Sequence, residues 1–335
     1  MSDPVATAAP AAAPDAAAGA GLIARLRALP PAAYVVHLAF VLIVVFFAIT
    51  LRDDGFLTSQ NLWNIVRQTA PVSIMAVGVV FVLAAGEIDL SIGSIVALAA
   101  LVGAIVLRDV GLVAGVAAGL GVGLTVGLVN GLMTAFLRLP SFLVTLATMG
   151  LVAGLARMTT DLQAVAVADD AFVSVFGGGD IGPIPGLAIW TLVAVALGHV
   201  MLRHTRFGAR VLAVGDNPAA AAVTGIRVGW LRVAVLATSG TLAGLAGLLF
   251  AGRLQAASYT LGASELLTVI AAVVIGGTRL FGGSATMVGA LVGSLILGVL
   301  NNGLILLGLS SNGQLVAQGV LLLLAISVTL REPKV

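Results

Sequence analysis

Residues 110–137 read VGLVAGVAAGLGVGLTVGLVNGLMTAFL. This stretch contains no Asp, Glu, Lys or Arg, and a helix needs about 20 apolar residues to cross the hydrocarbon core of a bilayer. The whole chain shares this character, because 60% of its 335 residues are hydrophobic and only 9% are charged. A soluble domain carries roughly 25% charged residues. The sequence therefore predicts an all-α protein with a surface that faces lipid.

About ten apolar segments meet the length and charge requirements of membrane spans. Two of them are short, so eight spans with two re-entrant segments are the alternative that also keeps both termini on one side. Between the first and second segments, residues 61–68 look amphipathic and interfacial. The ten expected spans are 32–51, 71–85, 91–107, 110–137, 141–158, 186–202, 233–252, 266–277, and two within 280–330 that turn at 310–313.

The charges outside these spans predict the orientation of the chain. Cytoplasmic loops are enriched in Lys and Arg, which places the basic 203–232 loop, Arg25 with Arg27, and Arg331 with Lys334 in the cytoplasm. The 160–185 loop carries four Asp and no basic residue, so it should lie outside. We expect a disordered cytoplasmic tail at 1–31, one transmembrane domain at 32–330 and a cytoplasmic tail at 331–335.

Several kinds of chemistry are excluded by composition. The chain has no Cys, which excludes disulfides, thiolate metal sites and Cys nucleophiles. Its three His share no metal-ligand spacing, and no Gly-rich phosphate-binding loop ends in Lys and Ser or Thr. The sequence therefore predicts no cofactor or metal on this chain and no enzyme activity, and any nucleotide hydrolysis must come from a partner.

Two weak internal matches recur about 170 positions apart, as expected of transporter repeats. Residues 127–132 (GLVNGL) resemble 298–304 (GVLNNGL), and 91–94 (SIGS) resemble 261–264 (LGAS). They suggest structural repeats at 71–159 and 238–328. Because an odd number of crossings separates them, the repeats would be inverted, an arrangement that often forms transport paths. The alternative is chance similarity among helices rich in Gly, Leu and Val.

Within residues 110–137, a glycine recurs every four residues from position 115 to position 131. Small residues at this spacing let two helix backbones approach closely, so we expect a packing face, either in the core or at a subunit interface. Its members are Gly115, Gly119, Gly123, Gly127 and Gly131.

Polar side chains within the apolar segments are candidates for a solute pathway, because they are costly at membrane depth. Asp89 and Ser91 could equally cap the start of the following helix. The amides of Asn130, Asn301 and Asn302 could equally hydrogen-bond between helices.

Within the basic loop, residues 217–226 (NPAAAAVTGI) predict a short helix. Asn217 fits its cap, Pro218 its first position and Gly225 its stop. An uncharged helix at the membrane face could dock in a partner's cleft, or be a plain connector. The candidate docking residues are Asn217, Pro218, Ala219, Ala220, Thr224, Gly225 and Ile226.

These segments together resemble the permease subunits of bacterial ABC importers for ribose, xylose, arabinose and galactosides. The matches are 76–78 (AVG), 86–94 (GEIDLSIGS), 203–208 (RHTRFG), the 217–226 segment, and the Gly-rich run 270–303. Together they extend in order over roughly 35–330. The sequence departs from the family where Ala219 and Ala222 replace the usual Glu and Arg of the docking helix, and where Thr268 replaces an Asp.

The resemblance implies a multi-pass protein of the bacterial inner membrane with both termini in the cytoplasm. It implies a homo- or heterodimer of permeases, cytoplasmic subunits that bind ATP and Mg²⁺ and dock on residues 215–228, and a periplasmic or lipid-anchored solute-binding protein. The expected solute is a monosaccharide, with a pentose as the first choice. A permease for branched-chain amino acids, nucleosides or a signalling molecule is the alternative. An ion-coupled secondary transporter is disfavoured, because such carriers place ionisable groups in their spans.

Overall fold

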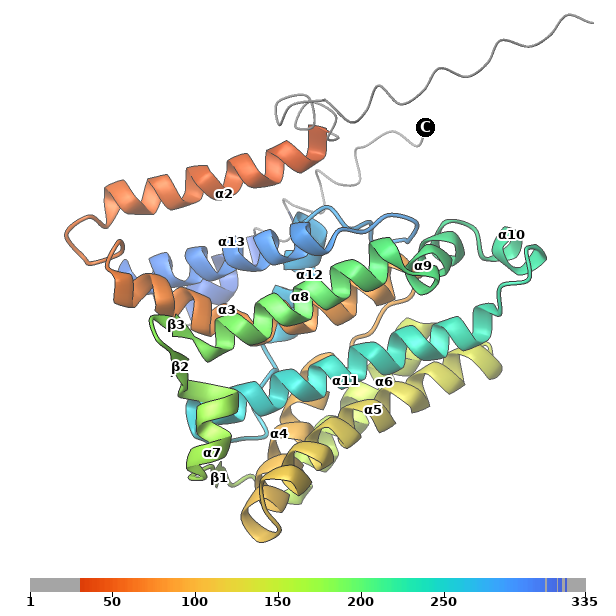
Figure 1. Ribbon diagram of the computed structural model, residues 1–335, viewed down its shortest axis with the longest axis horizontal. Helices are drawn as coiled ribbons and strands as arrows, with labels where there is room; N and C mark the ends of the chain where they lie inside the picture. The colour runs from red at the N-terminus through yellow and green to blue at the C-terminus, as the bar shows by residue number, and fades with distance from the viewer. Residues whose placement is uncertain (1–30, 311, 318, 321–322, 324–335) are drawn as a thin grey trace, which may run out of the picture.

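The structure is a computed structural model that describes residues 31–310, 312–317, 319–320 and 323 (Figure 1). The tails at 1–31 and 331–335, with their basic residues, lie outside these residues except for Pro31. The longer helices are α2 (Pro31–Thr50), α3 (Ser59–Ala84), α4 (Ile92–Asp109), α5 (Leu112–Phe136), α6 (Ser141–Thr159), α8 (Gly186–His204), α11 (Val228–Leu254) and α13 (Met287–Leu306). The shorter elements are β1 (Val165–Ala166), α7 (Asp170–Val173), η1 (Ser174–Gly178), β2 (Asp180–Ile181), β3 (Ile184–Pro185), α9 (Arg206–Asp216), α10 (Pro218–Val223), β4 (Ala256–Ala257) and α12 (Glu265–Ile275).

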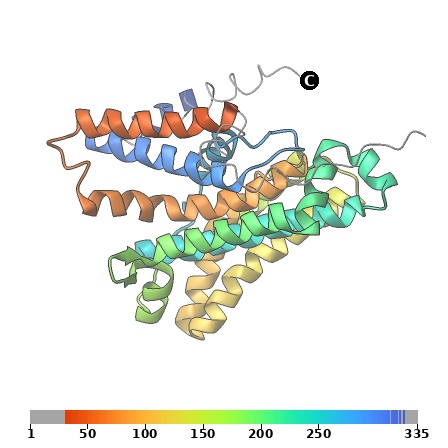
Figure 2. The ribbon, with the colours of Figure 1, turned by 45° about the horizontal axis from the view of Figure 1, so that its top comes forward.

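Among the described residues, seven helices are long and apolar enough to cross a membrane, and two shorter apolar helices cover Val36–Thr50 and Glu265–Ile275. The chain is therefore a polytopic helical membrane protein. The last predicted span falls on a region that is described only in part. Figures 1 and 2 agree that α2 lies beside α13 at one side of the bundle, with α5 at the opposite side.

The segments 61–68 and 71–85 form one helix, so the prediction of a separate interfacial helix is wrong. Helix α3 has 26 residues and contains Pro71 in its interior. The Thr58 side chain caps its start by accepting from the Asn61 N–H. Pro71 lacks an N–H and so favours a break, but neighbouring helices and hydroxyl side chains make proline tolerable in membrane helices. Here the Thr69 hydroxyl donates to the Ile65 carbonyl, 2.8 Å away, shortly before the proline.

The five glycines of the repeating stripe lie on the buried face of α5. Their neighbours are backbone and side-chain atoms of α11 and α4. A Cβ built on Gly127 would lie 2.5 Å from the Leu236 carbonyl oxygen, and one on Gly131 would lie 2.6 Å from Val233 Cα. The stripe thus packs within this chain rather than at its outer surface.

Two helices begin beside each other inside the bundle. Helix α3 ends before Gly86, whose φ is +77°, and residues 87–91 run without regular structure to the start of α4. Helix α12 follows a turn that contains Gly262. A Cβ on Gly93 would lie 2.5 Å from the Gly262 carbonyl, and one on Gly262 would lie 2.6 Å from the Gly93 carbonyl. With 11 residues and about 1.5 Å of rise each, α12 is too short to span the roughly 30 Å core.

The two ends of the bundle differ in charge and structure. At one end, the strand β1 pairs with β4, and β2 pairs with β3. Asp180 of the acidic loop lies there, 2.7 Å from Arg67. At the opposite end lie α9 and α10 (Figure 1). The basic 203–232 segment is mostly helical rather than a loop with one short helix, since α9, α10 and the start of α11 cover most of it. Thr205 caps α9 by accepting from the Gly208 N–H.

Candidate functional site

Asp89 lies in the break between α3 and α4 and is only 3% exposed. Its Oδ1 accepts hydrogen bonds from the Ser91 N–H at 3.0 Å and the Ser91 hydroxyl at 2.6 Å. Its Oδ2 accepts from the Ser239 hydroxyl of α11 at 2.9 Å. The carboxylate therefore ties the break both to the start of α4 and to the middle of α11. Ser91 is the residue that precedes α4, and its own side chain does not cap the helix.

The backbone of the same break is satisfied by α6. The Ser141 hydroxyl accepts from the Ile88 N–H at 3.0 Å, and the Thr145 hydroxyl accepts from the Leu90 N–H at 3.1 Å. Irregular backbone at membrane depth requires such partners, because no lipid group can replace them. Sequence patterns alone did not reveal this pair, although two hydroxyls four residues apart lie on one face of a helix and could have indicated it.

Glu87, at the start of the break, forms an ion pair with α11. Its Oε1 lies 2.5 Å from Arg232 Nε, and the side chains of Glu87 and Arg232 are 7% and 32% exposed. The carboxylate is thus buried, while part of the guanidinium reaches the surface. Arg232 belongs to the second turn of α11 rather than to the basic loop in which its sequence context places it.

The structure brings one of the three candidate amides to this cluster. Asn130 of α5 donates from Nδ2 to the Ser91 hydroxyl at 3.0 Å. Its Oδ1 and the Thr134 hydroxyl, one turn on, are buried without a protein partner among the described residues. Asn302 lies elsewhere and exchanges hydrogen bonds of 2.8 and 2.9 Å with Asn61 of α3. Asn301 is half-buried beside it on α13.

The short helix predicted in the basic segment is confirmed as α10. The Asn217 side chain accepts from the Ala220 N–H at 3.0 Å, Pro218 is the first residue, and Gly225 has a φ of +86°. Ala219, Ala220 and Thr224 are exposed, and Ile226 is half-buried. Val223 is 90% exposed, so the helix presents an apolar, uncharged surface at the basic end of the bundle.

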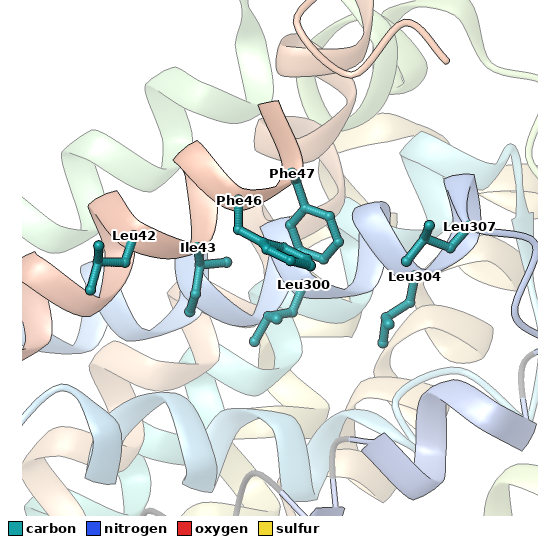
Figure 3. A pocket seen from close by; sticks show the side chains of 7 residues that line it. All are labelled: Leu42, Ile43, Phe46, Phe47, Leu300, Leu304 and Leu307. Atoms are coloured by element: carbon teal, nitrogen blue, oxygen red, sulfur yellow. The ribbon is translucent and has the colours of Figure 1, made fainter. Parts of the chain in front are cut away.

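A groove of about 450 Å³ lies between α2 and α13. Figure 3 shows the side chains that line it along the two helices, with the rings of Phe46 and Phe47 beside Leu300. They are all apolar, and a sugar or amino acid would find no hydrogen-bond partner among them. This groove therefore suits hydrocarbon rather than a polar solute. Its lining is Leu42, Ile43, Phe46, Phe47, Leu300, Leu304 and Leu307.

The described residues contain no group of three or more His, Cys, Asp or Glu side chains that could hold a metal ion. What they contain is a set of membrane helices, two of which begin inside the bundle, and an exposed helix at the basic end. Helices that begin inside a membrane bundle are typical of membrane transport proteins.

Comparison with known proteins defines the family. A family model described as the permease component of branched-chain amino acid transport systems matches residues 61–326. The ribose import permease protein of Bacillus subtilis is 40% identical over 86% of this chain and 89% of its own length. The L-arabinose ABC transporter permease protein of Azospirillum brasilense is 35% identical over 86% of this chain and 85% of its own length. The chain therefore belongs to the family of ABC transporter permeases, and the resemblance to permeases of sugar importers is confirmed. No solved structure gives a significant match.

Proposed function

We propose that this chain is the membrane-spanning permease subunit of an ATP-driven ABC importer for a monosaccharide, with a pentose as the first candidate. The names of similar proteins support a sugar, since they specify ribose, L-arabinose and xylose. The family description mentions branched-chain amino acids, so leucine uptake is the alternative that a test should include.

The observation that carries this proposal is helix α10. A helix whose exposed residues are Pro, Ala and Val gains little from contact with water, and apolar surface at a water-facing end marks an interaction site. We assign it as the docking site of the cytoplasmic ATP-binding subunit, with residues 217–226 as its core. ATP and Mg²⁺ would bind on that partner, and this chain would carry no cofactor.

The orientation follows from the same assignment. The end that carries α9 and α10 would lie in the cytoplasm, and the acidic end around Asp180 would face the outside, as the positive-inside rule requires. With ten spans, both termini would be cytoplasmic in the bacterial inner membrane. A second permease subunit would complete the path, and a solute-binding protein would deliver sugar to the acidic end.

Helix boundaries support the inverted repeat. Helix α3 covers 59–84 and α11 covers 228–254, while α5 ends at 136 and α13 at 306. These boundaries recur at a spacing of about 170 residues, close to that of the sequence matches. The repeats would place α4 and α12 in equivalent positions, and the mutual contact of Gly93 and Gly262 is what a pseudo-two-fold axis produces.

Co-purification with the ATP-binding subunit tests the proposal. Val223→Asp adds a charge to α10 at a position that is 90% exposed, and Ile181→Asp makes the same change at the opposite end, where Ile181 is 70% exposed. We expect the first variant to lose the ATPase and the second to retain it. Uptake of ribose and of leucine into proteoliposomes, with candidate binding proteins supplied outside, then identifies the solute class. Solute uptake by the chain alone, without ATP, would refute the proposal.

A further inference from the structure

The connection between α10 and α11 is short and spans residues 224–227. The Ile226 N–H donates to the Ala221 carbonyl of α10 at 3.2 Å, and the Leu231 N–H donates to the Arg227 carbonyl at 3.1 Å. The connection therefore carries hydrogen bonds to both helices. We expect a displacement of α10 to pass through it to the first turns of α11.

Helix α11 holds the break between α3 and α4 at two points. Near its start, Arg232 pairs with Glu87. Seven residues later, Ser239 donates to Asp89 at 2.9 Å. Residues seven apart lie on one face of a helix, separated by about 10 Å along its axis. The same face of α11 thus holds both acidic side chains of the break.

Helix α9, which directly precedes α10, abuts the end of α3 and the segment that follows α12. Gly215 lies against the Ala84 carbonyl at the end of α3, and a Cβ on Gly215 would lie 2.7 Å from the Gly283 nitrogen in the segment after α12. The Gly283 N–H also donates to the Ala84 carbonyl at 3.2 Å. Three backbones therefore meet without intervening side chains, directly beside the proposed docking helix.

We infer that residues 86–91, which α11 contacts through Arg232 and Ser239, carry movement of α10 into the membrane. Glu87 and Arg232 act as positioning residues and stay paired throughout the transport cycle. This inference rests on the proposed function. The far end of the segment reaches α4 where Gly93 contacts Gly262, so a shift of the segment changes the contact between the two helices that begin inside the bundle.

The burial of Glu87 is the reason that the pair stays joined. A carboxylate that is 7% exposed loses its compensating charge if Arg232 withdraws, and an unpaired buried charge is strongly unfavourable. Separation of Glu87 from Arg232 therefore costs more free energy than movement between parts of the bundle that are held by weaker contacts. The segment and α11 therefore move as one body.

Substitution of the pair tests whether it transmits movement. Glu87→Gln and Arg232→Gln should still assemble with the ATPase and hydrolyse ATP within about two-fold of wild type, but transport at least about ten-fold less sugar per ATP, because removing one partner of a buried pair leaves the other uncompensated. The exchange Glu87→Arg with Arg232→Glu should recover much of that loss. Arg67→Gln is the matched control, because it breaks the 2.7 Å pair with Asp180 at the opposite end and should leave the ratio unchanged.

Cross-linking tests whether the pair stays joined. The chain has no Cys, so Glu87→Cys with Arg232→Cys can be bridged by a short bifunctional thiol reagent without background. We expect the bridged double-Cys protein to transport sugar at nearly the rate of the charge-exchanged variant, which has no Cys and cannot be bridged. Transport that stops on bridging would overturn the inference, as would wild-type transport per ATP in both single variants. If the wild-type chain does not bind the ATPase at all, the proposed function itself fails. If either single variant is lost on extraction, the bridged protein still decides.

Discussion

Gly127→Ala is the sharpest test of how the bundle is held together. Gly127 lies in the middle of α5 against α11, and an added Cβ would lie 2.5 Å from the Leu236 carbonyl oxygen and 2.9 Å from Ala237 Cα. The obstructing atoms belong to the backbone, so no rotation of a side chain can relieve the contact. The two helices must separate or shift along each other.

The size of the effect follows from this distance. The shortest ordinary contact is 3.4 Å, so the backbones must part by about 0.9 Å (3.4 minus 2.5). Overpacking of this kind costs about 1–3 kcal/mol. Alanine recovers up to about 1 kcal/mol through its higher helix propensity. Subtraction of the full recovery leaves a net loss of up to about 2 kcal/mol, which corresponds to a thermal midpoint lower by up to about 8 °C at the scaling of larger domains.

Thermal unfolding in detergent, followed by the fluorescence of the three Trp residues, measures this loss. Gly121→Ala is the matched control, because it makes the same change six residues earlier on α5, where no atom lies within 4 Å of the new Cβ. We expect the control to keep or raise the midpoint. Equal midpoints for the two variants would refute the argument that close backbone contact at the stripe stabilises the bundle.

Three further substitutions have defined outcomes. Asn302→Leu leaves Asn61 without the reciprocal hydrogen bonds and should lower the free energy of unfolding by about 0.6–1.7 kcal/mol, measured by the same thermal assay. Asp89→Ala removes the acceptor of the Ser91 and Ser239 hydroxyls and should cost about 1–3 kcal/mol for each buried donor left unpaired, whereas Asp89→Asn should cost less. Gly225→Ala strains a residue with φ of +86° that has no neighbour within 4 Å, at about 1–2 kcal/mol. It should weaken ATPase co-purification, and Gly225→Asn, which tolerates this conformation better, should restore part of it.

The sequence predicted most of what depends on local pattern. Hydropathy located the long spans, since long apolar runs bounded by charges are typical of membrane helices. The capping residue Asn217 and the stop at Gly225 predicted α10 because both act within one turn of their own position. The glycine spacing predicted a packing face on α5, although not its partner helix α11.

What the sequence did not predict depends on contacts between distant segments. The break at Asp89 was visible, but Ser141, Thr145 and Ser239, which hold it, look like ordinary residues of apolar helices until the fold brings them together. Helix α3 looks like two segments in the sequence because Pro71 and the polar residues before it resemble a helix end. Packing of neighbouring helices around the proline overrides that local signal.

The same contacts bear on how solute is recognised. A carboxylate has about four acceptor positions, and three donors already occupy three of those of Asp89. A sugar hydroxyl could use more than the one remaining position only by displacing Ser91 or Ser239, which would release the break from α4 or α11. Asp89 is thus engaged mainly in holding irregular backbone, as expected where no water can do so. This organisation favours a path through which solute passes, rather than a site that holds solute tightly. Selection of the solute is then expected to rest with the partner that delivers it.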